Sequence, residues 1–134
     1  MSLTPAKDSV DVGIFVSDIK KSLDFYQGIL GLEKTEELPT PFGTLHRLHY
    51  GTSDIKLMDP KKVPSAGAIG LEKQLGFRYL TFVIRNLTGL CAVLKQKGVE
   101  FTIPETEIRP GTRIAMVKDP DGNIIEFVER GQKS

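Results

Sequence analysis

Glu126 is an acidic side chain within a strand pattern that is otherwise apolar. In an extended strand, Ile125 and Phe127 face one way, and Ile124, Glu126 and Val128 face the other. A carboxylate among apolar neighbours is a candidate for proton transfer or for ligand binding. A solvated glutamate on an edge strand is the alternative interpretation of the same pattern.

Cationic and imidazole side chains recur on the preceding strands. A hairpin over 44–58 with a two-residue turn at 51–52 places Arg47, His49 and Lys56 on one face. His46 differs from His49 by three positions, so it faces the other way. The same alternation predicts that Arg113, on the corresponding strand of the second half, points with them into a ligand cleft between the two halves of the chain. Two arginines favour an anionic or oxygen-rich ligand, although solvated strand arginines would give the same pattern.

Two aromatic residues stand at the start of the two halves of the chain. Phe15 and Tyr79 each belong to a first strand and could stack on a ring of a ligand. A role as filler between packed elements is equally compatible with their positions.

The elements that must position these residues follow from hydrophobic periodicity. The first half predicts a strand at 10–16, a helix that begins after Ser17-Asp18 and ends at Gly31, and strands at 32–38, 44–50 and 53–58. The second half predicts a strand at 77–84, a helix that begins after Asn86 and ends at Gly98, and strands at 99–103, 112–118 and 124–129. Residues 104–110 are expected to form a loop, and Asp119-Pro120-Asp121-Gly122 a hairpin turn.

The second half therefore repeats the first. Residues 15–19 match 83–87 at an offset of 68, and Lys56 matches Glu126 at an offset of 70. The pattern predicts an α+β fold with two tandem βαβββ modules that form a concave sheet cup. We expect a single domain over 1–134, made of a module at 10–58, a linker at 59–76 bordering a pocket, and a module at 77–129.

Composition limits the classes of partner. A net charge of +1 gives no electrostatic basis for binding nucleic acid or an anionic membrane, and no apolar run reaches the length of a membrane span. The single cysteine, Cys91, excludes an internal disulfide and favours a reducing compartment, which predicts a cytoplasmic protein. Cys91 lies on the apolar side of a predicted helix, as a buried, inert thiol does.

The chain resembles the vicinal oxygen chelate superfamily, which includes glyoxalase I, bleomycin resistance proteins, fosfomycin resistance enzymes and extradiol dioxygenases. The likeness rests on residues 12–18, on the helix from Ser22 to Leu32, and on residues 119–123 with Glu126. It covers residues 10 to 129. It implies two βαβββ modules, a small-molecule ligand and, as in many members, a homodimer. It does not determine the reaction, because the superfamily includes several kinds of enzyme and also pure binding proteins.

The resemblance also implies four metal-ligand positions, which fall on Asp11, Lys56, Tyr79 and Glu126. Only Glu126 keeps a residue type that is usual for the family. An ammonium such as that of Lys56 has no lone pair and repels a divalent ion, and the phenol of Tyr79 must first lose a proton. We therefore expect no metal at the usual four-ligand site. An atypical site formed by Asp11, His49 and Glu126 is one alternative, and an ion pair of Lys56 with Glu126 or Asp11 is another.

Two functions remain open at this point. One is a lyase- or isomerase-like enzyme acting on a small oxygenated or anionic substrate, with Glu126 or Asp11 as general base and with Lys56, Arg47 and Arg113 stabilising negative charge. In that case Phe15, His49 and Tyr79 would complete the substrate site. The other is a metal-free protein that sequesters its ligand, like the bleomycin resistance proteins.

Overall fold

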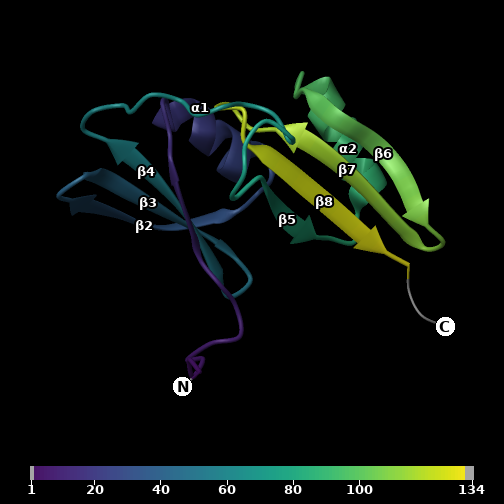
Figure 1. Cartoon of the computed structure of the whole chain (residues 1–134), viewed down its shortest axis with the longest axis horizontal. Helices are drawn as coiled ribbons and strands as arrows, with labels where there is room; N and C mark the ends of the chain where they lie inside the picture. Colours follow the sequence, from purple (N-terminus) through teal and green to yellow (C-terminus); the bar gives the residue numbers. More distant parts are fainter. Residues whose placement is uncertain (1, 132–134) are drawn as a thin grey trace. The chain divides into compact units, whose positions relative to one another are not determined.

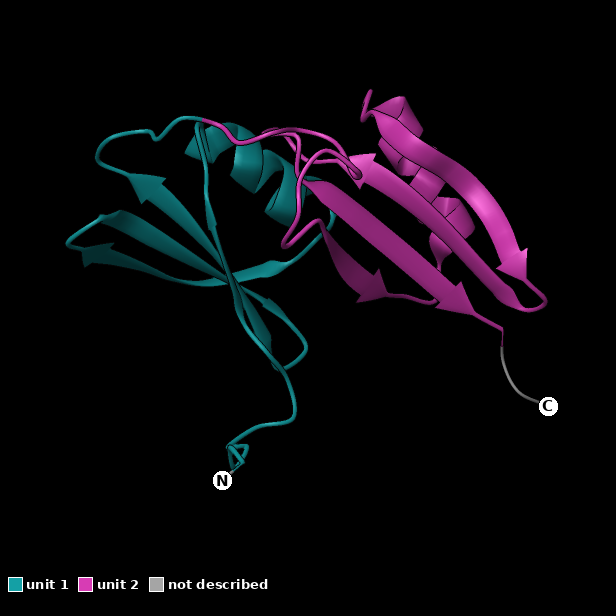
Figure 2. Ribbon diagram, viewed as in Figure 1, with its two compact units in different colours: residues 1–65 teal, residues 66–134 magenta. Residues whose placement is uncertain are grey.

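The computed structural model describes residues 2–131 and divides the chain into two compact units (Figures 1 and 2). The N-terminal unit comprises residues 1–65 and the C-terminal unit residues 66–134. Each unit contains one four-stranded mixed sheet with a helical segment between its first and second strands. The predicted α+β class with two βαβββ modules is therefore confirmed.

The N-terminal unit has the sheet order β1-β4-β3-β2, with β1 parallel to β4 and the other pairs antiparallel. Its elements are β1 (Val12–Phe15), α1 (Ile19–Leu23), the π-helix η1 (Asp24–Ile29), β2 (Glu33–Thr40), β3 (Gly43–Tyr50) and β4 (Ser53–Pro60). Helix α1 begins where the sequence predicts, because the Asp18 carboxylate accepts a hydrogen bond from the Lys21 backbone N–H.

The C-terminal unit repeats this order as β5-β8-β7-β6. Its elements are β5 (Tyr79–Val83), α2 (Leu87–Gln96), β6 (Phe101–Arg109), β7 (Thr112–Lys118) and β8 (Ile124–Arg130). Strand β8 is antiparallel to β7 and parallel to β5. Helix α2 contacts β6, β7 and β8, and in Figure 1 it lies against one face of this sheet.

Strand registers confirm the internal repeat. Gly13 lies opposite Lys56 in the N-terminal unit, and Thr81 lies opposite Glu126 in the C-terminal unit. These two pairs are related by the offsets of 68 and 70 found in the sequence. Lys56 and Glu126 therefore occupy equivalent positions in the two sheets.

Alternation along the strands separates a buried face from a more polar one. In the N-terminal unit, Leu48, Ile55 and Leu57 are at most 3% exposed, as the sequence predicts for the face that packs under a helix. In the C-terminal unit, Ile125 and Phe127 are buried to the same degree. We call the face that carries Lys56 in the first unit, and Glu126 in the second, the open face of each sheet.

The prediction of a loop over residues 104–110 is wrong. Strand β6 continues to Arg109 and pairs with β7 through several register shifts. It is the outermost strand of its sheet, so the missing N–H of Pro104 can lie on the unpaired side. Pro39 occupies an equivalent outer strand, β2.

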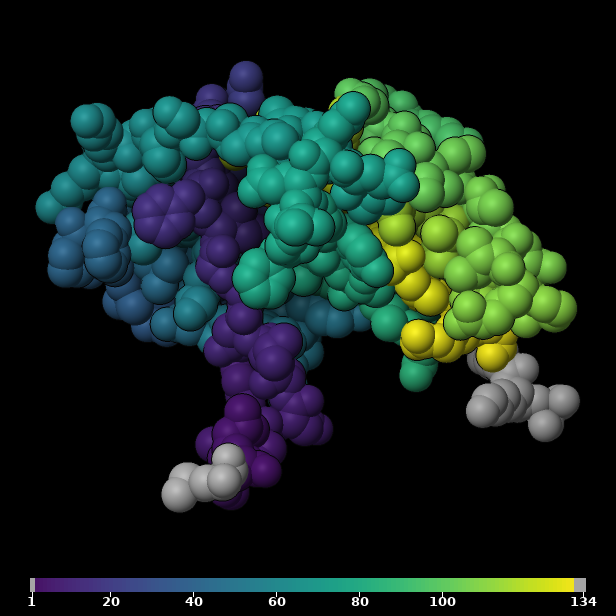
Figure 3. Space-filling model, viewed as in Figure 1, coloured from purple at the N-terminus to yellow at the C-terminus, as the bar shows by residue number. Residues whose placement is uncertain are grey.

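The connection before β5 lies at the surface, where its teal-to-green atoms are visible in the space-filling view (Figure 3). Residues 61–69 are exposed. Ile69 lies against Gly122 in the turn between β7 and β8, and this glycine has φ +87. Within residues 2–131, no helix is long and apolar enough to cross a membrane.

Candidate functional site

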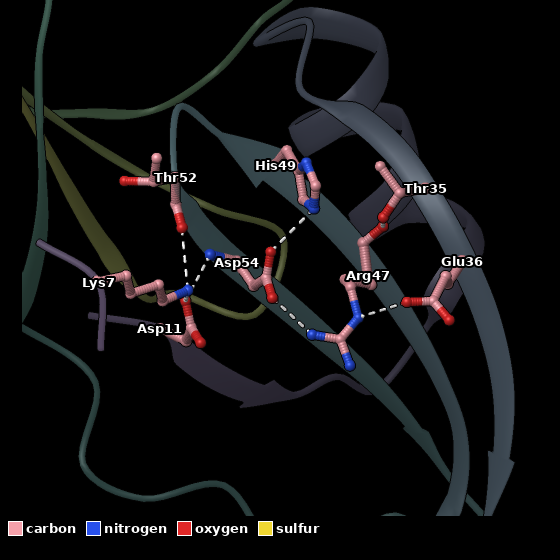
Figure 4. A network of polar contacts seen from close by, with 8 residues as sticks. All are labelled: Lys7, Asp11, Thr35, Glu36, Arg47, His49, Thr52 and Asp54. Atoms are coloured by element: carbon pink, nitrogen blue, oxygen red, sulfur yellow. Dashed lines mark hydrogen bonds and ion pairs between the residues drawn. The ribbon is translucent and has the colours of Figure 1, made fainter. Parts of the chain in front are cut away.

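A network of polar side chains on the open face of the N-terminal unit is centred on Asp54 (Figure 4). Arg47 Nη1 lies 2.6 Å from Asp54 Oδ2, and His49 Nε2 lies 3.0 Å from Asp54 Oδ1. The backbone N–H of Asp54 donates to Asp11 Oδ1 at 2.8 Å. The side chain of Asp54 is only 16% exposed, and its two oxygens lie against the Arg47 guanidinium and the His49 imidazole.

Asp11 is held from its other side by the N-terminal segment. Lys7 Nζ donates to Asp11 Oδ1 at 2.6 Å and to the Thr52 carbonyl at 2.9 Å. The hydrogen bond from Lys7 is the largest cause of a lowered pKa of Asp11, followed by the hydrogen bond from the Asp54 backbone. A carboxylate with a lowered pKa is a weaker base, so this geometry weakens the case for Asp11 as a general base.

The open-face placement predicted for Lys56, Arg47 and His49 is confirmed by the register. Arg47 lies directly opposite Lys56, and His49 directly opposite Asp54. Arg47 Nε also lies 3.1 Å from Glu36 Oε1, without the geometry of a hydrogen bond. The guanidinium therefore lies between two carboxylates, whereas Lys56 forms no ion pair within residues 2–65.

His46 faces away from this network, as predicted. It lies opposite Leu57, is 6% exposed, and has Nδ1 3.4 Å from Glu37 Oε1. Burial is the largest cause of its lowered pKa, and the charge of Lys34 adds to this effect. The imidazole of His46 thus belongs to the interior of the unit.

In the C-terminal unit, Glu126 and Tyr79 share the open face. Thr81 lies opposite Glu126, and its hydroxyl donates to Glu126 Oε1 at 2.7 Å. Tyr79 is 55% exposed, and in the other unit Phe15 is 53% exposed. Both rings are available for contact with a ligand, and their roles in binding one stay predictions.

The predicted orientation of Arg113 is wrong. Its Nη1 contacts Glu105 and lies 2.8 Å from the Thr88 hydroxyl of α2, and its Nη2 lies 3.1 Å from Glu129 Oε1. Glu129 Oε1 also accepts the Leu87 backbone N–H at the start of α2. Arg113 therefore lies on the helix-covered face and stabilises the N-terminus of α2.

The orientation of Arg113 was predicted wrongly because it was matched to Arg47, although the strand registers make another residue the equivalent of Arg47. Arg47 pairs with Lys56, while the residue that pairs with Glu126 on β7 is Met116. Met116 is thus the structural equivalent of Arg47. Arg113 lies three positions before it, and an odd displacement along a strand reverses the face.

Asp54 and Lys7 are the polar groups that sequence reasoning missed as site residues. The signal for Asp54 was present, because the two-residue turn that places His49 also places Asp54 opposite it. No periodic signal identified Lys7, which precedes β1 in a segment without regular structure.

The fold of two βαβββ modules defines a class of protein, and comparisons with known proteins agree with it. Residues 9–127 match the family described as Glyoxalase/Bleomycin resistance protein/Dioxygenase superfamily, so the chain belongs to that family. It is 30% identical over 120 residues to a lactoylglutathione lyase of Escherichia coli O157:H7. The alignment covers 85% of this chain and 86% of that protein.

Solved structures give the same assignment of fold. A glyoxalase family protein from Bacillus cereus aligns with a TM-score of 0.81 at 15% identity and covers 98% of this chain and 99% of that one. TnmS3, an antibiotic binding protein from Streptomyces sp. CB03234, aligns with a TM-score of 0.70 at 25% identity and covers 96% of this chain and 100% of that one.

The residues at the four positions expected to bind metal do not fit that role. As an ammonium, Lys56 offers no lone pair, and the phenol of Tyr79 must first lose a proton. The carboxylate of Asp11 already accepts a hydrogen bond from the ammonium of Lys7. Residues 2–131 contain no group of three or more histidine, cysteine, aspartate or glutamate side chains placed to hold a metal ion. The alternative set of Asp11, His49 and Glu126 draws on both units and stays a prediction.

Proposed function

We propose that this protein is a lyase- or isomerase-like enzyme of the glyoxalase family that acts on a small oxygenated or anionic substrate without the four-ligand metal centre. Family membership and 30% identity to a lactoylglutathione lyase support the reaction class. The observation that carries the proposal is the environment of Lys56. Its ammonium stands at a position where the family resemblance implies a metal ligand, and it forms no ion pair within residues 2–65, although its charge is the smallest of the causes that lower the pKa of Asp11.

The surroundings of Lys56 favour an incoming anion. Gly13 lies opposite it on β1, and a methyl group added to Gly13 would contact nothing within 4 Å. Arg47, on the other side, is balanced by Asp54 and Glu36. An ammonium offers three hydrogen-bond donors, so Lys56 suits a carboxylate or an enolate oxygen and would stabilise negative charge that develops during a reaction.

Binding of lactoylglutathione tests this role, because that compound carries carboxylates and a thioester carbonyl. Calorimetry in chelator-treated buffer is expected to show binding by the wild type and at least a tenfold loss of affinity, about 1.4 kcal/mol, in Lys56→Met. Lys20→Met, which removes an exposed lysine of α1, is the matched control. Equal affinities of wild type and Lys56→Met would refute the role of Lys56.

Glu126 remains the proposed general base among the two carboxylates, since its one hydrogen bond from Thr81 leaves other lone pairs free. Glu126→Gln is expected to abolish turnover while leaving binding detectable. Sequestration of a ligand is the second candidate, and the 25% identity to an antibiotic binding protein supports it. Stoichiometric binding without turnover would favour this candidate.

A cytoplasmic homodimer completes the proposal. Strands β1 and β5 are outer strands of their sheets, so each leaves backbone groups open to pairing. The buried thiol of Cys91, whose pKa is raised chiefly by burial, suits a reducing compartment. Analytical ultracentrifugation measures the mass in solution, and a monomer at all concentrations would exclude the dimer.

A further inference from the structure

His49 and Asp54 form a carboxylate–imidazole pair that neither the family resemblance nor the sequence pattern assigned. His49 Nε2 lies 3.0 Å from Asp54 Oδ1, and Arg47 holds the second oxygen of the same carboxylate at 2.6 Å (Figure 4). The side chain of Asp54 is 16% exposed, while that of His49 is 43% exposed. A fixed carboxylate thus orients a ring that still reaches solvent.

This arrangement divides the two ring nitrogens between two tasks. The nitrogen that faces a carboxylate carries hydrogen, so in the neutral ring Nδ1 keeps its lone pair. Nδ1 of His49 has no partner among the described residues of the N-terminal unit. A carboxylate that fixes the tautomer and orientation of an imidazole is the arrangement by which histidine acts as a general base.

The pair also lies beside the proposed anion site. His49 and Lys56 are diagonal neighbours across β3 and β4, and such positions are about 7–8 Å apart, within reach of long side chains. The charged groups facing His49 are Asp54 on β4, Glu33 opposite it on β2, and Lys56 and Arg47 on its own face. Asp11, the nearby carboxylate, is occupied by Lys7.

We infer that His49, oriented by Asp54, is the proton-transfer residue of the N-terminal unit for a carbon acid whose oxygen is bound by Lys56. This inference rests on the proposed function. His49 Nδ1 accepts the hydrogen on the carbon next to a carbonyl group as a proton. The electron pair of the broken C–H bond forms a carbon–carbon double bond, and the π pair of the carbonyl group moves onto its oxygen to give an enolate. Lys56 stabilises the enolate, and the proton returns from Nδ1 to carbon, so no oxidant or reductant is needed.

Exchange of the lactoyl C2 hydrogen of lactoylglutathione in deuterated buffer, followed by NMR, tests the step. The wild type is expected to incorporate deuterium, and His49→Gln to slow incorporation at least about 100-fold with the dissociation constant changed less than about threefold. Asp54→Asn is expected to give an intermediate rate. Added imidazole is expected to restore exchange in His49→Ala, which a merely structural role would not produce. His46→Gln, which removes the only other histidine, is the control and should exchange like the wild type.

The outcomes separate this inference from the proposed function. Undiminished exchange in His49→Gln overturns the inference, and the function stands if Glu126→Gln then abolishes exchange. Binding of lactoylglutathione by the wild type without exchange overturns the inference and favours sequestration. Absence of binding refutes the proposed function and this inference with it. Independently of any ligand, ¹⁵N NMR is expected to show neutral His49 protonated at Nε2, and protonation at Nδ1 instead would overturn the inference.

Discussion

Replacement of Arg113 by methionine is expected to destabilise the protein without affecting ligand binding. Methionine keeps much of the aliphatic length of arginine but removes the guanidinium that contacts Glu105, Glu129 and Thr88. Two carboxylates whose side chains are 23% and 24% exposed would then face each other without a cation. One of them, Glu129, also accepts the first backbone N–H of α2.

The size of the effect follows from the partial burial of this cluster. Exposed ion pairs contribute about 0.2–1 kcal/mol each, whereas loss of one partner from a fully buried pair costs about 3–5 kcal/mol. Arg113 is 33% exposed and serves two carboxylates, so we expect a loss of about 2 kcal/mol. For a chain of this length that loss lowers the midpoint of thermal unfolding by roughly 8 °C.

Differential scanning calorimetry at low and high salt measures this loss. The difference between wild type and Arg113→Met should shrink as salt screens the ion pairs. Arg130→Met, which removes an exposed arginine at the end of β8, is the control and should unfold near the wild-type temperature. If Arg113→Met unfolds like the wild type but loses affinity for lactoylglutathione, the placement of Arg113 on the helix-covered face is wrong.

Three further predictions concern other parts of the chain. Burial lowers the pKa of His46 in the folded state below its ordinary value of 6.5, so between the two pKa values the unfolded chain binds more protons than the folded one. The contribution of His46 to the free energy of unfolding is therefore full above pH 6.5 and is lost as the pH falls below that value. Denaturant titrations of His46→Gln should show a flatter pH dependence of stability than those of the wild type. Gly43→Ala would bring Cβ to 2.1 Å from the Asp59 carbonyl oxygen at φ +148 and should cost more than about 2 kcal/mol, whereas Gly89→Ala, on the open surface of α2, should stabilise by about 0.5–1 kcal/mol; urea unfolding of both variants compares them. Lys56→Glu restores a residue type usual at that position of the family and should raise divalent-metal affinity at least about tenfold by calorimetry, and an unchanged affinity would contradict the placement of the four positions.

The sequence was sufficient to predict the fold and the faces of the central strands. Period-two alternation and two tight turns fix the register of β3, β4, β7 and β8, and register alone places Lys56 and Glu126 on equivalent open faces. The turn before β8 is also stabilised by the side chain of Asp119. The carboxylate of Asp119 accepts the backbone N–H groups of Asp121 and Asn123, in addition to the turn chemistry of Pro120 and Gly122.

The ion pairs could not be predicted in the same way. Lys56 was expected to pair with Asp11 or Glu126. The ammonium that contacts Asp11 is that of Lys7, from a segment whose path has no periodic signal, and Lys56 acts on Asp11 only through its charge. The pair of Lys56 with Glu126 joins the two units and stays a prediction. The orientation of Arg113 failed because the offset between β3 and β7 is 69, and counting from the wrong equivalent residue by three positions reverses the face. Local pattern determines which face a residue occupies, whereas the choice of partner depends on side-chain geometry across strands.

The difference between the two halves lies in what faces each equivalent position. On β5, Thr81 supplies a hydroxyl to Glu126, whereas on β1 the equivalent residue, Gly13, has no side chain to offer Lys56. The carboxylate in the C-terminal unit is therefore held by a neutral donor, while the ammonium in the N-terminal unit has space beside it on the side of Gly13. A divalent cation would be repelled by Lys56, but an anion would meet an ammonium whose three donors have no hydrogen-bond partner among residues 2–65. In the proposed function, the lysine that does not fit a metal site thus supplies the positive charge for an anionic ligand.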